Sequence, residues 1–298
     1  MSRLIKATVF LTAISGVFAA PAQLFARQDS HDHDDHDHVE AWDAGAVTQY
    51  QIHSSCNATQ AHQIAVGLNE TIQLVSHARD HVLRWGNTSE IYQRYFGGRP
   101  PYEVLGAYEI IINGDKEGVL FRCDNPDGNC DIEGWGGHWR GSNATSETVI
   151  CDLSYETRRS LNQMCALGYT VSESPRNTFW ASDLLHRLYH VPAVGYGYIE
   201  HFADGYEEIL ELAQTDEIGP TRDTDTLQYF ALDAYAYDIA VPGVGCNSPE
   251  TEAESGSSNS TAPTTTSTGS PTVPEPSTST VSIPAGCHTH EGGDLHCS

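Results

Sequence analysis

The eight cysteines constrain this 298-residue chain more than any other feature of its sequence. An even number of cysteines is typical of a protein that folds in an oxidising compartment, where thiols pair as disulfides. Six of them lie inside the central part of the chain, at Cys56, Cys123, Cys130, Cys151, Cys165 and Cys246. One sequence does not determine how they pair. Local pairs Cys123–Cys130 and Cys151–Cys165 are one plausible arrangement, which would leave Cys56 to close onto Cys246.

The start of the chain indicates secretion. Arg3 and Lys6 form a basic start, and an apolar run with small residues at its end continues to residue 20, so we predict a signal peptide over 1–20. No later apolar run is long enough to cross a bilayer. We therefore expect a secreted protein, extracellular or associated with the cell wall, without membrane insertion. Asn-X-Ser/Thr sites predict glycosylation at Asn57, Asn69, Asn87, Asn143 and Asn259.

Composition divides the remaining chain into four regions. Residues 21–40 form a His- and Asp-rich arm, which we expect to be disordered and to bind metals loosely. Residues 41–246 have mixed apolar patterning and enough length for one domain with a full core. Residues 247–286 are rich in Ser, Thr and Pro, a composition that cannot bury a core. A short Cys/His tail, 287–298, ends the chain.

The central region predicts an α+β fold. An apolar residue recurs every three or four positions along one long helix, at Ile64, Leu68, Ile72, Val75, Ala78 and Val82. Residues 106–112, 118–122 and 148–153 are predicted strands, and 181–190 and 222–239 are predicted helices. A long helix, short strands and two further helices form an α+β order.

The formal net charge of −25 excludes one class of ligand. Such a field repels the phosphate backbone of nucleic acids. It favours cations, although solubility in an extracellular medium would explain it equally well.

The sequence His186-Arg187-Leu188-Tyr189-His190 places two imidazoles four residues apart on one face of a predicted helix, where both can reach one ion. Zinc proteases use this spacing with a glutamate after the first histidine, as the general base. Arginine cannot accept a proton, so Arg187 predicts metal binding without hydrolysis. Two ordinary helix histidines are the alternative. An open zinc site needs a third ligand; we favour His201, with Asp204 and Asp233 as alternatives.

Two further histidine clusters are present. His77 and His81 flank the apolar face of the long helix, where a hydrogen-bonded histidine pair is favoured over a second metal site. The tail gathers three histidines and two cysteines within eleven residues, and Gly292-Gly293 allows a turn that brings His296 back toward the others. We predict a zinc-binding tail with Cys287, His288, His290, His296 and Cys297.

Long stretches of the chain resemble one known family. They include WDAGAV, IHSSCNATQ, HVLRWGN, FRCDNPDGNC, EGWGGHWRG, NATSETVICD, NTFWASDLLHRLYHVPAVG, HFADGY, YFALDAYAYDIA and CHTHEGGDLHC. The chain is identified as a member of the secreted fungal antigen family that includes the fibrinogen-binding allergen of Aspergillus and the pH-regulated antigen, or zincophore, of Candida. The resemblance runs from about Trp42 to Cys246 and resumes in the tail, where the zinc motif is matched at each of its five ligand positions.

The family resembles deuterolysin-type zinc peptidases, which implies a zincin-like fold. We expect members of the fungal family, such as the Candida antigen, to carry an intact His-Glu-x-x-His followed by an aspartate. This chain would then depart from its family with Arg187 in place of the glutamate and His201 in place of the aspartate. The resemblance implies a zinc scavenger that returns zinc to the cell through a membrane zinc transporter and that binds host proteins such as fibrinogen or complement regulators. The alternatives are an active zinc endopeptidase and an adhesive cell-wall antigen whose metal is only structural.

Overall fold

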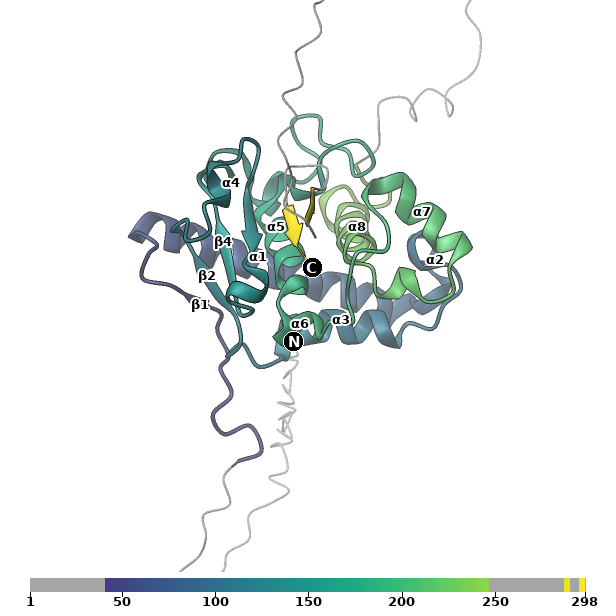
Figure 1. Cartoon of the computed structure of the whole chain (residues 1–298). Coiled ribbons are helices and arrows are strands. Elements are labelled where there is room, and N and C mark those ends of the chain that lie inside the picture. The colour runs from purple at the N-terminus through teal and green to yellow at the C-terminus, as the bar shows by residue number, and fades with distance from the viewer. Residues whose placement is uncertain (1–40, 247–286, 290–294, 298) are drawn as a thin grey trace, which may run out of the picture. The chain divides into compact units, whose positions relative to one another are not determined.

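A computed structural model describes residues 41–246 and the backbone of 287–289 and 295–297 (Figure 1). The predicted signal peptide, the arm over 21–40, the linker over 247–286, Asn259 and His290 lie outside the described residues. The chain divides into two units, Met1–Ala44 and Gly45–Ser298. In the first, only residues 41–44 are described, and they form a turn.

Helices dominate the second unit. The α-helices are α1 (Ala58–Trp85), α2 (Glu90–Phe96), α3 (Tyr102–Asn113), α4 (Asp152–Thr157), α5 (Trp180–His190), α6 (Pro192–Gly195), α7 (Gly205–Thr215) and α8 (Thr224–Tyr235), and α8 continues into the π-helical turn η7 (Ala236–Ala240). Short 3₁₀ turns are η1 (Gly86–Thr88), η2 (Asn129–Asp131), η3 (Gly141–Asn143), η4 (Leu161–Gln163), η5 (Arg176–Thr178) and η6 (Gly219–Thr221).

The long helix α1 confirms the periodic apolar face. A capping box begins it: the Asn57 side chain accepts the backbone N–H groups of Thr59 and Gln60, while Gln60 accepts the backbone N–H of Asn57. It packs against α3, α5 and α8. Gly67 permits the close approach to α5, because a Cβ there would lie 2.8 Å from Leu184 Cδ1. The core of the domain therefore forms between α1 and these three helices.

The sheet has four short strands in the order β1-β2-β4-β3. They are β1 (Gln51–Ile52), β2 (Leu120–Arg122), β3 (Gly137–Trp139) and β4 (Glu147–Ile150). β1, β2 and β4 run parallel, and β3 pairs antiparallel with β4, with His138 opposite Val149. The small sheet and the dominant helices confirm the predicted α+β class.

One predicted strand is a helix. Residues 106–112 lie inside α3, although Ile110, Ile111 and Ile112 are β-branched and favour strands locally. The buried positions decide the outcome: Val104, Ala107, Tyr108 and Ile111 recur at helical spacing and face the core. Of the other predicted strands, 118–122 contains β2. The strand predicted over 148–153 ends at Ile150, where α4 follows after Cys151.

The structure determines the disulfide pairing that the sequence left open, and it contains none of the pairs in the plausible local arrangement. The structure joins Cys56 to Cys123, Cys130 to Cys151 and Cys165 to Cys246. The sheet explains the first bond, because Cys56 follows β1 and Cys123 follows its parallel neighbour β2. Strand pairing, rather than short sequence separation, brings these two cysteines together.

The tail contains a two-stranded antiparallel pair, β5 (Cys287–Thr289) and β6 (Leu295–Cys297). Its backbone register places Cys287 opposite Cys297 and His288 opposite His296. Across the part of the chain that the structure describes, no helix is long and apolar enough to cross a membrane.

Candidate metal centre

Helix α5 supplies the first two histidines of the predicted site. It is buried over Trp180–Tyr189, so His186 sits among core side chains, while His190 at its end is half-buried. The helix ends at His190 because Val191 is extended and Pro192 follows. His186 and His190 therefore lie one turn apart at the C-terminal end of α5.

The third histidine, His201, lies in a loop whose backbone is hydrogen-bonded on both sides of it. The Glu200 N–H donates to Arg222 O, and Glu200 O accepts from the Thr224 N–H. On the other side, Asp223 Oδ1 accepts the backbone N–H groups of Phe202 and Ala203 at 2.8 and 3.1 Å. The segment before α8 thus places His201 against α5.

The three imidazoles converge through their Nε2 atoms. Nε2 of His190 lies 3.2 Å from Nε2 of His186 and 3.1 Å from Nε2 of His201. Two nitrogens bound to one tetrahedral zinc at ~2.0–2.1 Å lie about 3.3–3.4 Å apart. The spacing therefore fits three ligands of one ion with small adjustments, and within the described residues the cluster contains no carboxylate.

A buried carboxylate stands behind two of the rings. Asp225 Oδ1 lies 3.6 Å from Nδ1 of His186 and 3.7 Å from Nδ1 of His201, and it accepts no hydrogen bond among the described residues. An imidazole that binds metal through Nε2 carries its proton on Nδ1, and such a proton usually faces a carboxylate or carbonyl. This orphaned oxygen is where such a second partner belongs, so the donor set fits a bound metal.

Charge and burial act in opposite directions on Asp225. Burial raises the pKa of this carboxyl to about 8, while the nearby Arg176 guanidinium, with Nη1 3.2 Å from Oδ2, lowers it. The Gly205 N–H also donates to Oδ2 at 3.1 Å. A cation bound by the histidines favours the ionised carboxylate, so metal binding and loss of the Asp225 proton are linked.

A family model matches most of the chain. The family model described as "HRXXH: Putative peptidase family" matches residues 6–249. The chain belongs to this family. Its motif coincides with His186-Arg187-Leu188-Tyr189-His190. The expectation that Arg187 departs from the family is therefore wrong, because the arginine belongs to the HRXXH motif itself.

Several fungal relatives are similar over most of their length. The chain is 65% identical to "Major allergen Asp f 2" of Aspergillus fumigatus over 87% of each chain. It is 50% identical to "pH-regulated antigen PRA1" of Candida albicans, over 70% of this chain and 71% of the relative. A zinc peptidase from Grifola frondosa superposes with a TM-score of 0.45 and 16% identity, covering 61% of this chain and 99% of the peptidase.

The HRXXH arginine binds an aspartate on its own helix. Arg187 Nε and Nη2 donate to the two oxygens of Asp183 at 3.0 Å each, and Arg158 Nη2 donates to the same carboxylate at 3.1 Å. Burial opposes ionisation of Asp183, yet the two guanidinium charges keep its pKa below the ordinary value. Gly137 gives Arg187 its space, since a Cβ there would lie 2.7 Å from Arg187 Nη1.

Neither of the two alternative third ligands joins the cluster. Asp204 Oδ1 pairs with Arg176 Nη1 at 3.0 Å. Asp233 Oδ2 accepts from Arg94 Nη1 at 2.6 Å and from the Tyr95 hydroxyl at 3.1 Å. Asp225 takes the position behind the histidines instead. It was not predicted as a site residue, because it lies in the ordinary first turn of α8 and no spacing motif marks it.

The structure also places the remaining predicted residues. His77 and His81 share the carboxylate of Asp238. Four of the predicted glycosylation asparagines are exposed: Asn57, Asn69, Asn87 and Asn143.

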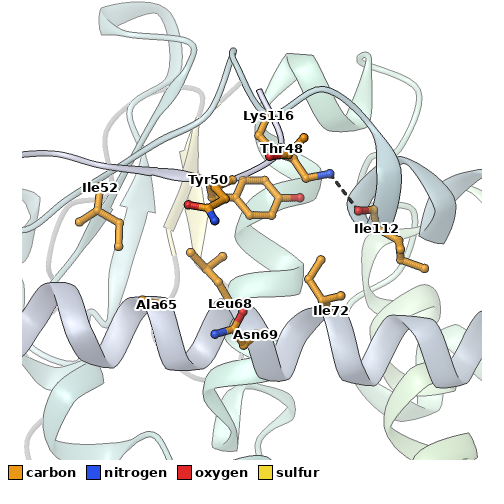
Figure 2. Close-up of a pocket in the computed structure, with 10 residues that line it drawn as sticks. Thr48, Tyr50, Ile52, Ala65, Leu68, Asn69, Ile72, Ile112 and Lys116 are labelled. Atoms are coloured by element: carbon orange, nitrogen blue, oxygen red, sulfur yellow. Dashed lines mark hydrogen bonds between the residues drawn. The ribbon is translucent and has the colours of Figure 1, made fainter. Parts of the chain in front are cut away.

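A pocket of about 350 Å³ has a lining that includes none of the candidate metal ligands (Figure 2). Residues before and in β1 cover it from one side and α1 from the other, and Lys116 Nζ donates to Ile112 O at 3.2 Å beside it. Its lining includes no histidine and no carboxylate, so it offers no metal ligands of the type found at the candidate centre.

Proposed function

We propose that this protein is a secreted zinc-binding protein that captures zinc outside the cell. The observation that carries the proposal is the convergence of three Nε2 atoms. Nε2 of His190 lies within 3.2 Å of Nε2 of both His186, on the same helix, and His201, in a hydrogen-bonded loop. In it, His186, His190 and His201 hold the ion, and water or another ligand completes the tetrahedron.

The donor set supports zinc over the common hard cations. Calcium and magnesium take oxygen ligands, whereas imidazole suits zinc and its transition-metal neighbours. The strongly negative chain attracts divalent cations toward the protein. In the same proposal the tail residues Cys287, His288, His290, His296 and Cys297 form a further zinc site.

Peptidase activity is the rival function, and the contacts of Arg187 argue against it. A zinc peptidase needs a carboxylate that takes the proton of the attacking water. Here the corresponding side chain is a guanidinium bound to Asp183. Asp225 faces Nδ1 rather than Nε2, so it lies on the wrong side of the rings to act as that base. We expect no zinc-dependent cleavage of casein, and cleavage that disappears in Glu200→Gln or Asp204→Asn would support the rival.

The biological role proposed for the captured ion is delivery to a membrane zinc transporter of the same cell. Binding of host proteins such as fibrinogen or complement regulators is a further proposed role, supported by the similarity to named fungal allergens and antigens. If the protein serves only as an adhesive wall antigen, a deletion strain will grow normally in zinc-limited medium. A scavenger predicts slower growth that added zinc restores.

Zinc content of the full-length protein tests the proposed site. Equilibrium dialysis should show that His186→Ala/His190→Ala loses one tightly bound zinc per chain. The matched control His62→Gln, an exposed histidine on α1, should retain it. Equal zinc content in the double variant and the wild type would refute the site.

A further inference from the structure

A second cluster of ligating side chains lies where η7 meets α1. His77 Nε2 lies 2.9 Å and His81 Nδ1 lies 2.6 Å from the same oxygen, Oδ2 of Asp238. The two histidines are one helical turn apart, so α1 presents both rings to one side. Two imidazoles and one carboxylate thus meet at a point.

The backbone that supplies the aspartate is unusual. η7 is a π-helical turn in which the Val241 N–H donates to Ala236 O at 2.9 Å, five residues back. π-helical turns are rare among helices overall, and those that occur are often found at functional sites. Asp238 lies within this turn, and its carboxylate contacts His77 and His81 of α1.

The ring of His81 is fixed from its far side. Its Nε2 lies 2.6 Å from Ser89 Oγ, and the same hydroxyl accepts the Tyr92 N–H at the start of α2. A hydroxyl at this position can accept the Nε2 proton and leave the Nδ1 lone pair facing Asp238. That outer contact is the usual support of a metal-bound histidine.

The surroundings combine a dry wall with an open side. The His81 ring packs at 4.7 Å from Trp85 and 5.8 Å from Phe230, and the His77 ring meets Tyr235 edge-on at 5.8 Å. A pocket of about 410 Å³ adjoins the cluster and is lined in part by His81 and Asp238. Ions and water can therefore reach the two histidines and Asp238 from the pocket, although aromatic side chains surround the rings on the other side.

We propose that His77, His81 and Asp238 form a second binding site for a divalent transition-metal ion such as Zn²⁺, with water from the pocket at the open positions. Two neutral nitrogens and one carboxylate suit a borderline transition ion rather than calcium or magnesium. The bound ion replaces the shared proton contacts on Asp238 and needs only a small separation of the three side chains. This site is independent of the one built on His186.

The test uses the full-length protein in the His186→Ala/His190→Ala background, so that the first proposed site is already absent. In that background, His77→Gln and Asp238→Asn should each lose one further zinc per chain by equilibrium dialysis, or bind it at least about tenfold more weakly. His62→Gln, on the same helix but outside the cluster, should lose none.

Two results would overturn the proposal. One is unchanged zinc content in both His77→Gln and Asp238→Asn, which makes the cluster a hydrogen-bonded clasp between α1 and η7. The other is a loss in His62→Gln equal to that in His77→Gln. His77 is about one-fifth exposed, so His77→Gln should fold normally and decides the question alone if Asp238→Asn does not.

Discussion

At the scale of single residues, the candidate centre depends on two buried aspartates that have different tasks. Asp225 faces the Nδ1 atoms of two histidines, and Asp183 binds the HRXXH arginine. The sequence supplied the histidines because their spacing is a recognisable pattern. It could not supply either aspartate, because each meets its partners through tertiary packing or an ordinary helical contact.

Removing the charge of Asp225 should weaken zinc binding without removing a ligand. We expect Asp225→Asn to lower the zinc affinity by about 10–100-fold, because the ligand rings lose the carboxylate that orients them. Asp204→Asn is the matched control, since both aspartates pair with Arg176 but only Asp225 faces the histidines. Calorimetric titration measures both, and equal affinity in the two variants would contradict the assigned role.

Arg187 should contribute to stability rather than to catalysis. Arg187→Met leaves the buried Asp183 with Arg158 as its remaining arginine partner among the described residues. Breaking one partner from such a buried pair costs about 3–5 kcal/mol in the free energy of unfolding. Denaturant unfolding should show this loss, whereas Arg84→Met on the exposed face of α1 should change stability by no more than about 0.5 kcal/mol. A similar small change in both would show that the arginine is not structural.

At the scale of elements, helix periodicity was the most reliable guide. It located α1 and α5 and placed His186 and His190 on one helix. It failed for α3, where the run of isoleucines favours a strand and only the spacing of the buried residues indicates a helix. The disulfide pairing could not be predicted from the sequence, because cysteines beside neighbouring strands, such as Cys56 and Cys123, are distant in sequence and meet only after folding.

The packing of α1 against α5 can be tested at one glycine. Gly67→Ala places a methyl group 2.8 Å from Leu184 Cδ1 and 3.0 Å from Trp180 Cβ. Overpacking of this kind costs about 1–3 kcal/mol, which outweighs the helix propensity gained. Gly106→Ala in α3 meets no atom within 4 Å and should instead stabilise by up to ~1 kcal/mol. The midpoint of thermal unfolding should therefore fall in Gly67→Ala and rise in Gly106→Ala. A shift in the same direction in both variants would contradict the packing of α1 against α5.

At the scale of the whole molecule, the proposed function implies that the protein holds zinc at neutral pH and releases it in acid. Imidazole ligands bind metal only when neutral, and a free histidine titrates near pH ~6.5. Asp225 is a further group that takes up a proton as the pH falls, because burial raises its pKa to about 8. Protons and zinc compete for all of these groups, so lower pH weakens binding.

Zinc affinity of the full-length protein should therefore fall steeply between pH 7.5 and 5.5, by about tenfold per pH unit for each proton that zinc displaces. Calorimetry in two buffers of different ionisation enthalpy would count the released protons. Constant affinity across this range, with no proton release, would exclude a histidine site.

The most direct test of the central claim is anomalous diffraction at the zinc edge from crystals of the zinc-loaded full-length protein. We expect a peak about 2.0–2.1 Å from Nε2 of His186, His190 and His201. Side chains that point apart, or zinc peaks only elsewhere on the molecule, would contradict it.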